Sequence, residues 1–350
     1  MKKNVAVIGY GGMGSWHARC ALESDVVSLK GVYDIKPEKN EKAREAGIYA
    51  YESFEAVLAD EDVDIIVCAT PNDVHKDIVI RALEAGKNAV CEKPVTMSVK
   101  DFDQMCETAK RAGKVFSVHQ NRRWDGDFLA IKELIESGEI GETINIESRV
   151  HGSRGIPGDW RRLKKYGGGM VLDWGVHLID QMLLLIPEKI KKIYCELDNV
   201  THEEVDDGMH LRLTFESGKR AHIEVSTYNF ISLPRLYMQG TLGSARIDTF
   251  SSKCSIARMN VWKEKEVLPV KTAAGITKTM APRDNFSIEN YEKEQPVSDV
   301  HDFYRNLVRA IDGAEMQAVK PEEVRRVLQV IEACFESAET NRAIVYENGL

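Results

Sequence analysis

The sequence predicts two domains, an α/β domain with a doubly wound parallel sheet followed by an α+β domain with antiparallel strands. Short apolar runs alternate with helical segments from residue 5 to residue 118, which is the pattern of parallel strands joined by crossover helices. From residue 143 onward, strands alternate apolar and polar positions, as half-buried antiparallel strands do. Because 350 residues suffice for two cores, we place the domains at residues 1–121 and 122–350, with the C-terminal helices free to pack back on the first domain.

The first predicted strand runs directly into a glycine-rich loop. Val5–Ile8 is continuously apolar, as in a strand buried on both faces, and a helical segment begins at Ser15. Between them stands G-Y-G-G-M-G, which fits the G-x-G-x-x-G pattern of a dinucleotide-binding Rossmann domain. Its first glycine permits a tight turn, its second lets a pyrophosphate approach the backbone, and its third lets helix and strand pack closely. The candidate cofactor residues of this loop are Gly9, Gly11, Gly12, Met13 and Gly14.

An acidic residue ends the second predicted strand. Val27–Tyr33 is strand-like and is followed by Asp34, twenty residues after Gly14. A carboxylate there accepts hydrogen bonds from the adenosine ribose hydroxyls and repels a 2′-phosphate, so we expect NAD rather than NADP as the cofactor. Lys36 works against this preference because a base tolerates the phosphate, and a turn residue before Pro37 is the alternative interpretation of the acid.

The other predicted strands of the first domain also end in polar residues. These strands are 64–69, 88–91 and 115–118, with helices predicted at 37–46, 53–58, 74–84 and 99–111. Because ligands bind such sheets at the carboxyl ends of the strands, the residues that follow the strands are expected along one edge, together with residues 119–123. We assign to cofactor binding Thr70, Pro71, Asn72, Glu92 and Lys93. An ammonium at position 93, beside a nicotinamide, suits a hydrogen bond to a substrate hydroxyl or carbonyl, although a solvated lysine is the simpler alternative.

Residues 122–350 carry the antiparallel pattern. A helix is predicted from Trp124 to Glu136, and strands 209–215 and 221–226 are joined as a hairpin. Such strands have one apolar and one polar face, so helices should cover one side of the sheet and leave the other to solvent or another subunit. Residues 264–296 are polar and are interpreted as a long loop or excursion, and amphipathic helices are expected at 299–311 and 322–338.

The composition narrows the partners and the compartment. A net charge of −8 argues against a nucleic-acid partner, which needs a basic face. The seven cysteines form no CxxC pair, and several lie in apolar runs, which is typical of free thiols in a reducing compartment. No stretch approaches the roughly 20 apolar residues of a membrane helix, and the first apolar run is too short for a signal peptide. We therefore expect a cytoplasmic protein without nucleic-acid or membrane partners.

The strongest candidate for chemistry is the segment from Gly167 to Ile186. After three glycines it is predicted to form a helix too apolar for the protein surface, yet Asp173, His177 and Asp180 fall at i, i+4 and i+7 and so share one face. Ionisable groups on a buried helix cost free energy unless each has a partner, which makes this polar line a candidate site. A hydrogen-bonded structural role and a metal site are the alternatives, since Asp and His are common ligands.

An aromatic and basic segment, W-R-R-L-K-K-Y at residues 160–166, precedes these glycines. A solvated helix end is the simpler interpretation. In the alternative, functional interpretation, the ring face of Trp160 or Tyr166 lines a sugar pocket. Arg123, at the predicted sheet edge, is a further candidate for binding substrate.

Taken together, these motifs resemble those of the Gfo/Idh/MocA oxidoreductases. The matching segments are G-Y-G-G-M-G at 9–14, Asp34, T-P-N-D-V-H at 70–75, E-K-P at 92–94, N-R-R at 121–123 and G-G-G-M-V-L-D-W-G-V-H-L-I-D at 167–180. The resemblance implies an N-terminal Rossmann domain, a C-terminal domain with a large, mainly antiparallel sheet, and homo-oligomers (dimer, tetramer or hexamer) built through that sheet. It also implies that Lys93, Asp173 and His177 face the nicotinamide, and it disfavours a metal at this site.

The version D-W-G-V-H with W-R-R upstream looks most like members of the family that oxidise ring hydroxyls of glycosides. We therefore expect an NAD-dependent oxidoreductase that converts a secondary ring hydroxyl of a sugar, glycoside or cyclitol into a ketone, as in glycoside 3-oxidation or inositol dehydrogenation. His177 would take the hydroxyl proton, Asp173 would orient His177 or a neighbouring substrate hydroxyl, and Lys93 would stabilise the developing alkoxide. The alternatives are an NAD-retaining glycosidase of the same fold and a non-catalytic sugar or dinucleotide sensor.

Overall fold

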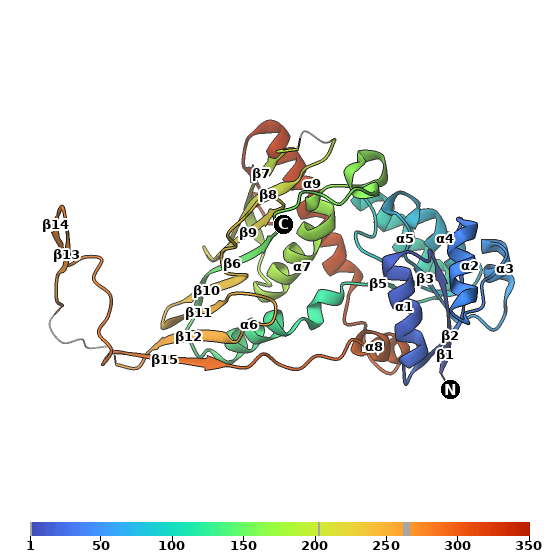
Figure 1. Ribbon diagram of the computed structural model, residues 1–350, viewed down its shortest axis with the longest axis horizontal. Helices are drawn as coiled ribbons and strands as arrows, with labels where there is room; N and C mark the ends of the chain where they lie inside the picture. The colour runs from blue at the N-terminus through green and yellow to red at the C-terminus, as the bar shows by residue number, and fades with distance from the viewer. Residues whose placement is uncertain (1, 202–203, 262–266) are drawn as a thin grey trace.

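The structure is a computed structural model that describes residues 2–201, 204–261 and 267–350 (Figure 1). Its first domain contains a five-stranded parallel sheet in the order β2-β1-β3-β4-β5. The strands are β1 (Lys3–Ile8), β2 (Val27–Tyr33), β3 (Ile65–Cys68), β4 (Asn88–Cys91) and β5 (Phe116–Val118). Strand β2 lies next to β1 on one side, and β3 lies next to β1 on the other side. The strand order therefore reverses between β1 and β3, and folds of this kind bind ligands at the carboxyl ends of those two strands. The predicted doubly wound sheet is thus confirmed.

Helices connect these strands close to the predicted positions. They are α1 (Gly12–Glu23), α2 (Pro37–Glu45), α3 (Phe54–Ala59), α4 (His75–Glu84) and α5 (Val99–Ala112). Strands β3, β4 and β5 are buried at every residue, whereas β2 is only partly buried. The apolar runs therefore formed central strands because only positions covered on both faces can bury every side chain.

The second domain contains a nine-stranded mixed sheet in the order β15-β12-β11-β10-β6-β9-β8-β7-β16. The pair β6–β9 is parallel and the remaining neighbours are antiparallel, which agrees with the expected large, mainly antiparallel sheet. The strands are β6 (Thr143–His151), β7 (Ile190–Asp198), β8 (Gly208–Phe215), β9 (Arg220–Ser226), β10 (Leu236–Gly240), β11 (Gly243–Ile247), β12 (Cys254–Met259), β15 (Ile288–Lys293) and β16 (Ile344–Val345). Helix α7 (Val176–Leu185) lies between this sheet and the first domain, and α6 (Gly126–Ser137) lies on the same side of the sheet (Figure 1).

The prediction of a long loop or excursion at 264–296 is wrong in part, and its first residues, 264–266, lie outside the described residues. Residues 288–293 form β15, which pairs with β12 at the edge of the large sheet. A small hairpin of β13 (Val270–Thr272) and β14 (Gly275–Thr277) lies far from the rest of the molecule (Figure 1). Most residues of β15 are exposed, so this strand lacks the apolar alternation by which β8 and β9 were recognised.

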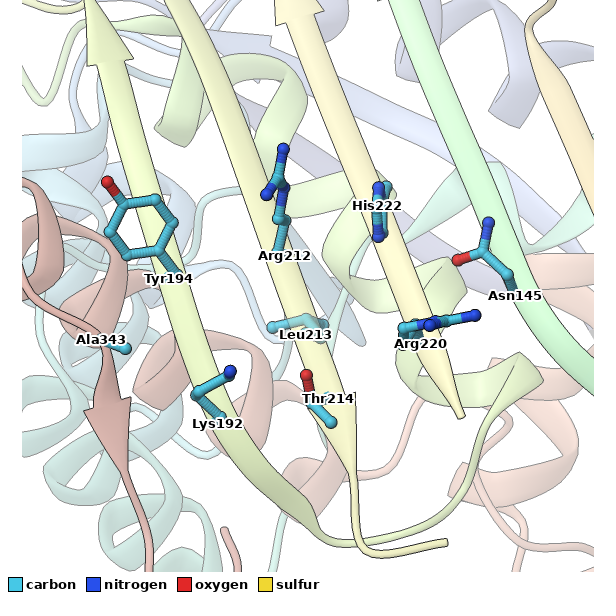
Figure 2. Close-up of a pocket in the computed structure, with 9 residues that line it drawn as sticks. All are labelled: Asn145, Lys192, Tyr194, Arg212, Leu213, Thr214, Arg220, His222 and Ala343. Carbon is cyan, nitrogen blue, oxygen red and sulfur yellow. The ribbon is translucent and has the colours of Figure 1, made fainter. Parts of the chain in front are cut away.

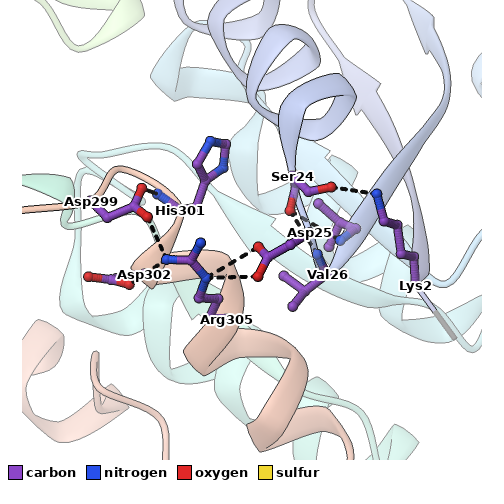
Figure 3. Close-up of polar contacts among 9 residues, drawn as sticks. Lys2, Ser24, Asp25, Val26, Asp299, His301, Asp302 and Arg305 are labelled. Carbon is purple, nitrogen blue, oxygen red and sulfur yellow. Dashed lines mark hydrogen bonds and ion pairs between the residues drawn. The ribbon is translucent and has the colours of Figure 1, made fainter.

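The C-terminal helix α8 (Asp302–Ile311) packs back on the first domain. Arg305 donates from Nε to the carboxylate of Asp25, which directly follows the end of α1, and the closer of the two oxygens lies at 3.1 Å (Figure 3). The next residue toward the N-terminus, Tyr304, is wholly buried, and its hydroxyl lies 2.7 Å from Nδ1 of His17 in α1. Helix α9 (Pro321–Thr340) packs against α7, β7 and α5, so it contacts both domains. No helix in the described part of the chain is long and apolar enough to cross a membrane.

Candidate active site

The glycine loop after β1 combines two kinds of glycine. A Cβ atom on Gly9 would lie 2.5 Å from the carbonyl oxygen of Ala69, and one on Gly14 would lie 1.7 Å from the carbonyl oxygen of Gly9. Packing within the chain therefore requires these two glycines. At Gly11 and Gly12, by contrast, a Cβ would meet no atom within 4 Å, so their surroundings are open to a ligand. This is the division of roles that a bound pyrophosphate requires.

The N-terminus of α1 and the Asp34 carboxylate complete this cradle. The cap residue of α1 makes no side-chain hydrogen bond and the first turn holds no acidic residue, which leaves N–H groups for phosphate oxygens; Met13 lies half-buried in that turn. Asp34 Oδ2 accepts from the Tyr10 N–H at 2.7 Å, and Oδ1 accepts from the Lys36 N–H at 2.9 Å. These bonds fix the carboxylate beside the glycine loop, while the Lys36 residue is exposed. The residues present fit a dinucleotide with a free ribose diol.

Lys93 joins the two domains at the carboxyl end of β4. Its Nζ donates to the main-chain oxygen of Asp173 at 2.8 Å and to Oδ1 of the same residue at 3.1 Å. The other carboxylate oxygen of Asp173 lies 3.3 Å from Nε of Arg161. Burial alone would raise the pKa of Asp173, but the positive charges of Lys93 and Arg161 outweigh burial and lower it. Asp173 is therefore ionised at neutral pH.

His177 has a buried ring nitrogen that is available to a ligand. The residue is 4% exposed, and its buried Nδ1 has no hydrogen-bond partner among the described residues. Burial, followed by the positive charges of Lys93 and Arg122, holds the pKa of this imidazole well below its usual value. A neutral imidazole without a partner can accept a proton from a ligand. The expected bond from Asp173 to His177 is not found in the described structure, because the carboxylate is bound to Lys93 and Arg161 instead.

The helix that carries these residues is irregular. Residues 171–175 form a π-helix, and the regular helix α7 begins only at Val176. Single π-helical turns occur often at functional sites. Asp173 therefore lies in the π-helical turn and His177 in the first turn of α7.

Two predicted residues lie apart from this group. Asp180 accepts from Nε and Nη2 of Arg123 at 2.8 and 2.5 Å. The same guanidinium binds Glu323 at 2.6 Å and the Ala318 carbonyl at 2.9 Å, and its side chain is only 6% exposed. Arg123, expected to bind substrate, is instead held by groups of the protein on several sides. Asp180 was predicted to share a helix face with Asp173 and His177, but it forms a buried ion pair with Arg123 instead.

Two predicted cofactor residues are also engaged within the protein. Glu92 is buried, and one of its oxygens lies 2.8 Å from both Nε2 of His17 and Nδ1 of His119. Its other oxygen accepts from the backbone N–H of Lys93 at 3.2 Å. The Asn72 side chain donates to the Gly167 carbonyl at 2.8 Å. Of the remaining two, Pro71 is exposed and the Thr70 hydroxyl lies against a cysteine described below.

The aromatic and basic segment before the glycines contributes an arginine to the site. Trp160 and Tyr166 lie in short 3₁₀-helices, are half-buried, and have Arg161 and Lys165 over their rings at 4.8 and 4.6 Å. The structure brings Arg161, rather than either ring, to Asp173. The two arginines of W-R-R were the feature of the sequence that could have indicated this contact.

A partly exposed aromatic residue beside His177 was missed by the sequence analysis. The Trp174 ring packs edge-to-face against His177 with centroids 6.0 Å apart, and the Arg122 guanidinium lies 4.2 Å from the Trp174 centroid. Trp174 stands between the two predicted catalytic residues of D-W-G-V-H, so its position in the motif was a usable signal.

A cavity of about 600 Å³ lies elsewhere, on the outer face of the large sheet (Figure 2). Lys192, Arg212 and Arg220 line it from three neighbouring strands. None of these three forms an ion pair with any residue that the structure describes. The cavity lining therefore combines three basic side chains with no acidic one, although the whole chain is acidic.

The chain is similar to known oxidoreductases along both domains. Residues 3–120 match the model of the oxidoreductase family with an NAD-binding Rossmann fold, and residues 128–246 match the GFO/IDH/MocA C-terminal domain. An uncharacterised oxidoreductase of Schizosaccharomyces pombe is 40% identical over 148 residues, which cover 41% of this chain and 40% of the relative. The chain is also similar to myo-inositol 2-dehydrogenase of Thermotoga maritima, with 25% identity and 98% of each chain covered.

The fold also agrees with a solved structure. A NAD-binding protein from Listeria innocua is 49% identical, superimposes with a TM-score of 0.95, and is matched over 99% of both chains. The two family models together span more than half of this sequence, and residues 121–127 lie between them. The chain belongs to the Gfo/Idh/MocA family of oxidoreductases, and its N-terminal domain is the family's NAD-binding Rossmann domain.

Proposed function

We propose that the protein is an NAD-dependent dehydrogenase that oxidises a secondary ring hydroxyl of a sugar, glycoside or cyclitol to a ketone, by glycoside 3-oxidation or inositol dehydrogenation. The observation that carries the proposal is the pairing of the Lys93 ammonium with Asp173 beside a neutral His177 without a partner. An ammonium to stabilise an alkoxide and an imidazole to take a proton are what alcohol oxidation requires. The similarity to a myo-inositol 2-dehydrogenase supports the cyclitol part of the substrate class.

In the proposed mechanism, the glycine loop from Gly9 to Gly14 and Asp34 would hold NAD, which would supply the acceptor for the hydride of the carbinol carbon. His177 takes the hydroxyl proton, since its lowered pKa keeps the imidazole neutral and ready to accept. The Lys93 ammonium has three N–H groups, of which Asp173 occupies two. The third can bind the substrate oxygen and stabilise the negative charge that develops on it. Asp173 thus holds Lys93 in place. Its carboxylate would also accept a hydrogen bond from a neighbouring hydroxyl of the substrate.

The Trp174 ring supports a carbohydrate substrate. Trp174 is partly exposed and lies beside His177, and the C–H face of a sugar or cyclitol ring packs well on an aromatic ring. Arg122 holds this ring in place by a cation–π contact.

The test is a panel of sugars, glycosides and inositols incubated with NAD or NADP while NADH or NADPH absorbance is followed. We expect steady accumulation of NADH with at least one secondary ring alcohol. Product formation from a glycoside without accumulated NADH would instead identify the NAD-retaining glycosidase. NAD binding with no turnover across the panel would identify a sensor.

We further propose that the homo-oligomer is built through the outer face of the large sheet. The basic cavity of Lys192, Arg212 and Arg220 occupies one end of this face, while Glu196 and Asp198 lie further along β7. Two copies related by a twofold axis would bring each basic end against an acidic end, which offsets both charges. Light scattering should then give a dimer, tetramer or hexamer that Arg212→Glu weakens. The seven free cysteines support a reducing compartment, for which we propose the cytoplasm.

A further inference from the structure

Two cysteines end neighbouring strands of the parallel sheet, just before residues that are assigned to cofactor binding. Cys68 is the last residue of β3 and Cys91 the last of β4, and the two are partners in the parallel register. Both are fully buried, as is His75, and the two sulfurs and one imidazole nitrogen lie within 4.8 Å of one another. Paired strand residues are about 4.8 Å apart, which lies inside the range of roughly 4.4–6.8 Å that disulfides span between Cα atoms. The backbone thus allows a bond between these sulfurs.

His75 lies beside the two cysteines and contacts two main-chain carbonyl oxygens. Its Nε2 lies 2.9 Å from the Thr70 carbonyl oxygen and its Nδ1 lies 3.0 Å from that of Pro94. Thr70 follows β3 and Pro94 follows Lys93, so this ring links the two segments that continue from Cys68 and Cys91 toward the site. A change at the two sulfurs therefore acts directly on a ring that contacts both segments.

The two sulfurs are not equivalent. Burial would raise the pKa of the Cys68 thiol, but the hydrogen bond from Cys91, the charge of His75 and the Thr70 contacts lower it to about 6. The Thr70 hydroxyl lies 3.3 Å from this sulfur. Burial and the neighbouring Cys68 raise the pKa of Cys91. One member of the pair is thus a nucleophile at neutral pH and the other a protonated thiol.

A metal ion is the competing explanation, because two thiols and an imidazole form a soft ligand set. Ligation by His75 would require one of its ring nitrogens to give up a bond to Thr70 or Pro94. A histidine ligand normally keeps one such bond and points its other nitrogen at the metal. The two existing bonds therefore favour redox chemistry over metal binding.

We propose that Cys68 and Cys91 form a reversible disulfide on exposure to peroxide, and that this disulfide weakens NAD binding. The Cys68 thiolate attacks one oxygen of hydrogen peroxide and becomes a sulfenic acid, and the departing hydroxide takes a proton to form water. Cys91 then attacks the sulfenic sulfur, its thiol proton leaves with the hydroxyl as a second water, and the S–S bond forms. Overall, two thiols and one peroxide give one disulfide and two waters.

The expected effect on NAD follows from the contacts of His75. A bond between Cys68 and Cys91 draws together two sulfurs that lie beside this ring, so the ring and its contacts with the two carbonyl oxygens have to shift. Those carbonyls belong to Thr70, which is assigned to cofactor binding, and to Pro94, which follows Lys93. Loss of one hydrogen bond that holds these segments should reduce NAD affinity by about tenfold.

The chain contains a matched internal control. Cys195 and Cys334 are also buried and adjacent, and burial together with Cys195 raises the pKa of Cys334. The described residues place no histidine in a ligand cluster with this second pair. Peroxide should therefore oxidise Cys68 and Cys91 first, although both pairs are equally shielded from solvent.

The test treats the reduced, full-length protein with graded hydrogen peroxide, blocks remaining thiols, and maps disulfides by peptide mass. We expect a Cys68–Cys91 cross-link before any Cys195–Cys334 cross-link, and an NAD dissociation constant raised about tenfold and restored by dithiothreitol. Cys91→Ser should abolish the change in NAD affinity, while Cys195→Ser should leave it intact. These readouts need no substrate, so they are independent of the proposed dehydrogenase activity.

Oxidation of methionines without the Cys68–Cys91 cross-link would overturn the proposal, and this result needs no variant to fold. A cross-link that leaves NAD affinity unchanged would overturn its effect on the cofactor. Stoichiometric zinc binding lost in Cys68→Ser, with no disulfide under peroxide, would assign a metal site instead.

Discussion

Lys93 is bonded twice to Asp173, once to its main-chain carbonyl and once to its carboxylate, across the boundary between the two domains. The main-chain bond fixes the position of the ammonium relative to the π-helical turn, and the side-chain bond balances its charge. We expect Lys93→Met to lower kcat with the identified substrate by about 100- to 1,000-fold, the usual effect of losing a group that stabilises developing negative charge. Steady-state kinetics measure the loss, and Lys110→Met at an exposed position of α5 is the control. Near-normal turnover would remove Lys93 from the reaction.

His177→Ala should lower turnover by roughly 100- to 10,000-fold, because that is the usual contribution of a general base. NAD affinity, measured by titration, should change little, since the effect is on proton transfer. Unchanged turnover would show that another group takes the proton.

The acidic limb of the pH profile reports the same imidazole. A base acts when it is neutral, and the pKa of His177 is lowered from 6.5, so kcat/KM should fall only below that pH. Arg122→Leu removes one of the positive charges that lower this pKa. The acidic limb should therefore move to higher pH in this variant, while Arg246→Leu on the surface leaves it in place. A limb that stays fixed in Arg122→Leu would contradict the assignment to His177.

Arg123 should matter for stability rather than substrate affinity. Arg123→Met leaves Asp180 buried without its cation, which typically costs about 3–5 kcal/mol of unfolding free energy. Denaturant unfolding measures this loss, and Arg123→Met combined with Asp180→Leu should recover part of it. A folded Arg123→Met protein with greatly raised KM would restore its role in substrate binding.

Asp34→Ser should reduce the preference for NAD over NADP. The variant removes the charge that repels a 2′-phosphate and leaves Lys36 to attract it. The ratio of the two dissociation constants, measured by titration, should shift toward NADP by about tenfold or more, equivalent to one charge-assisted bond. An unchanged ratio would place the ribose away from Asp34.

Features set by neighbouring residues were predictable from the sequence. The spacing of Gly9 to Gly14 fixes a tight turn and close helix packing within six residues, and the structure shows both. The apolar run of β3 and the alternation of β8 likewise identify central and half-buried strands. The family motifs identified the segments that meet at the interdomain site.

Features set by distant partners were not predictable. Asp180 was grouped with His177 by helical spacing, but a guanidinium 57 positions away in the sequence takes it into a separate ion pair. Arg161 reaches Asp173 through two short 3₁₀-helices whose path no periodicity reveals. The edge strand β15 is recognised only from its pairing with β12.

The burial of Tyr304 against His17 has a consequence for how the molecule is made. The Rossmann half leaves the ribosome before the second domain, yet the hydroxyl that completes its buried cluster belongs to α8, which follows the large sheet in the chain. Its interior is therefore sealed only after α8 has been translated, so maturation of the nucleotide-binding half awaits a segment synthesised after the second sheet.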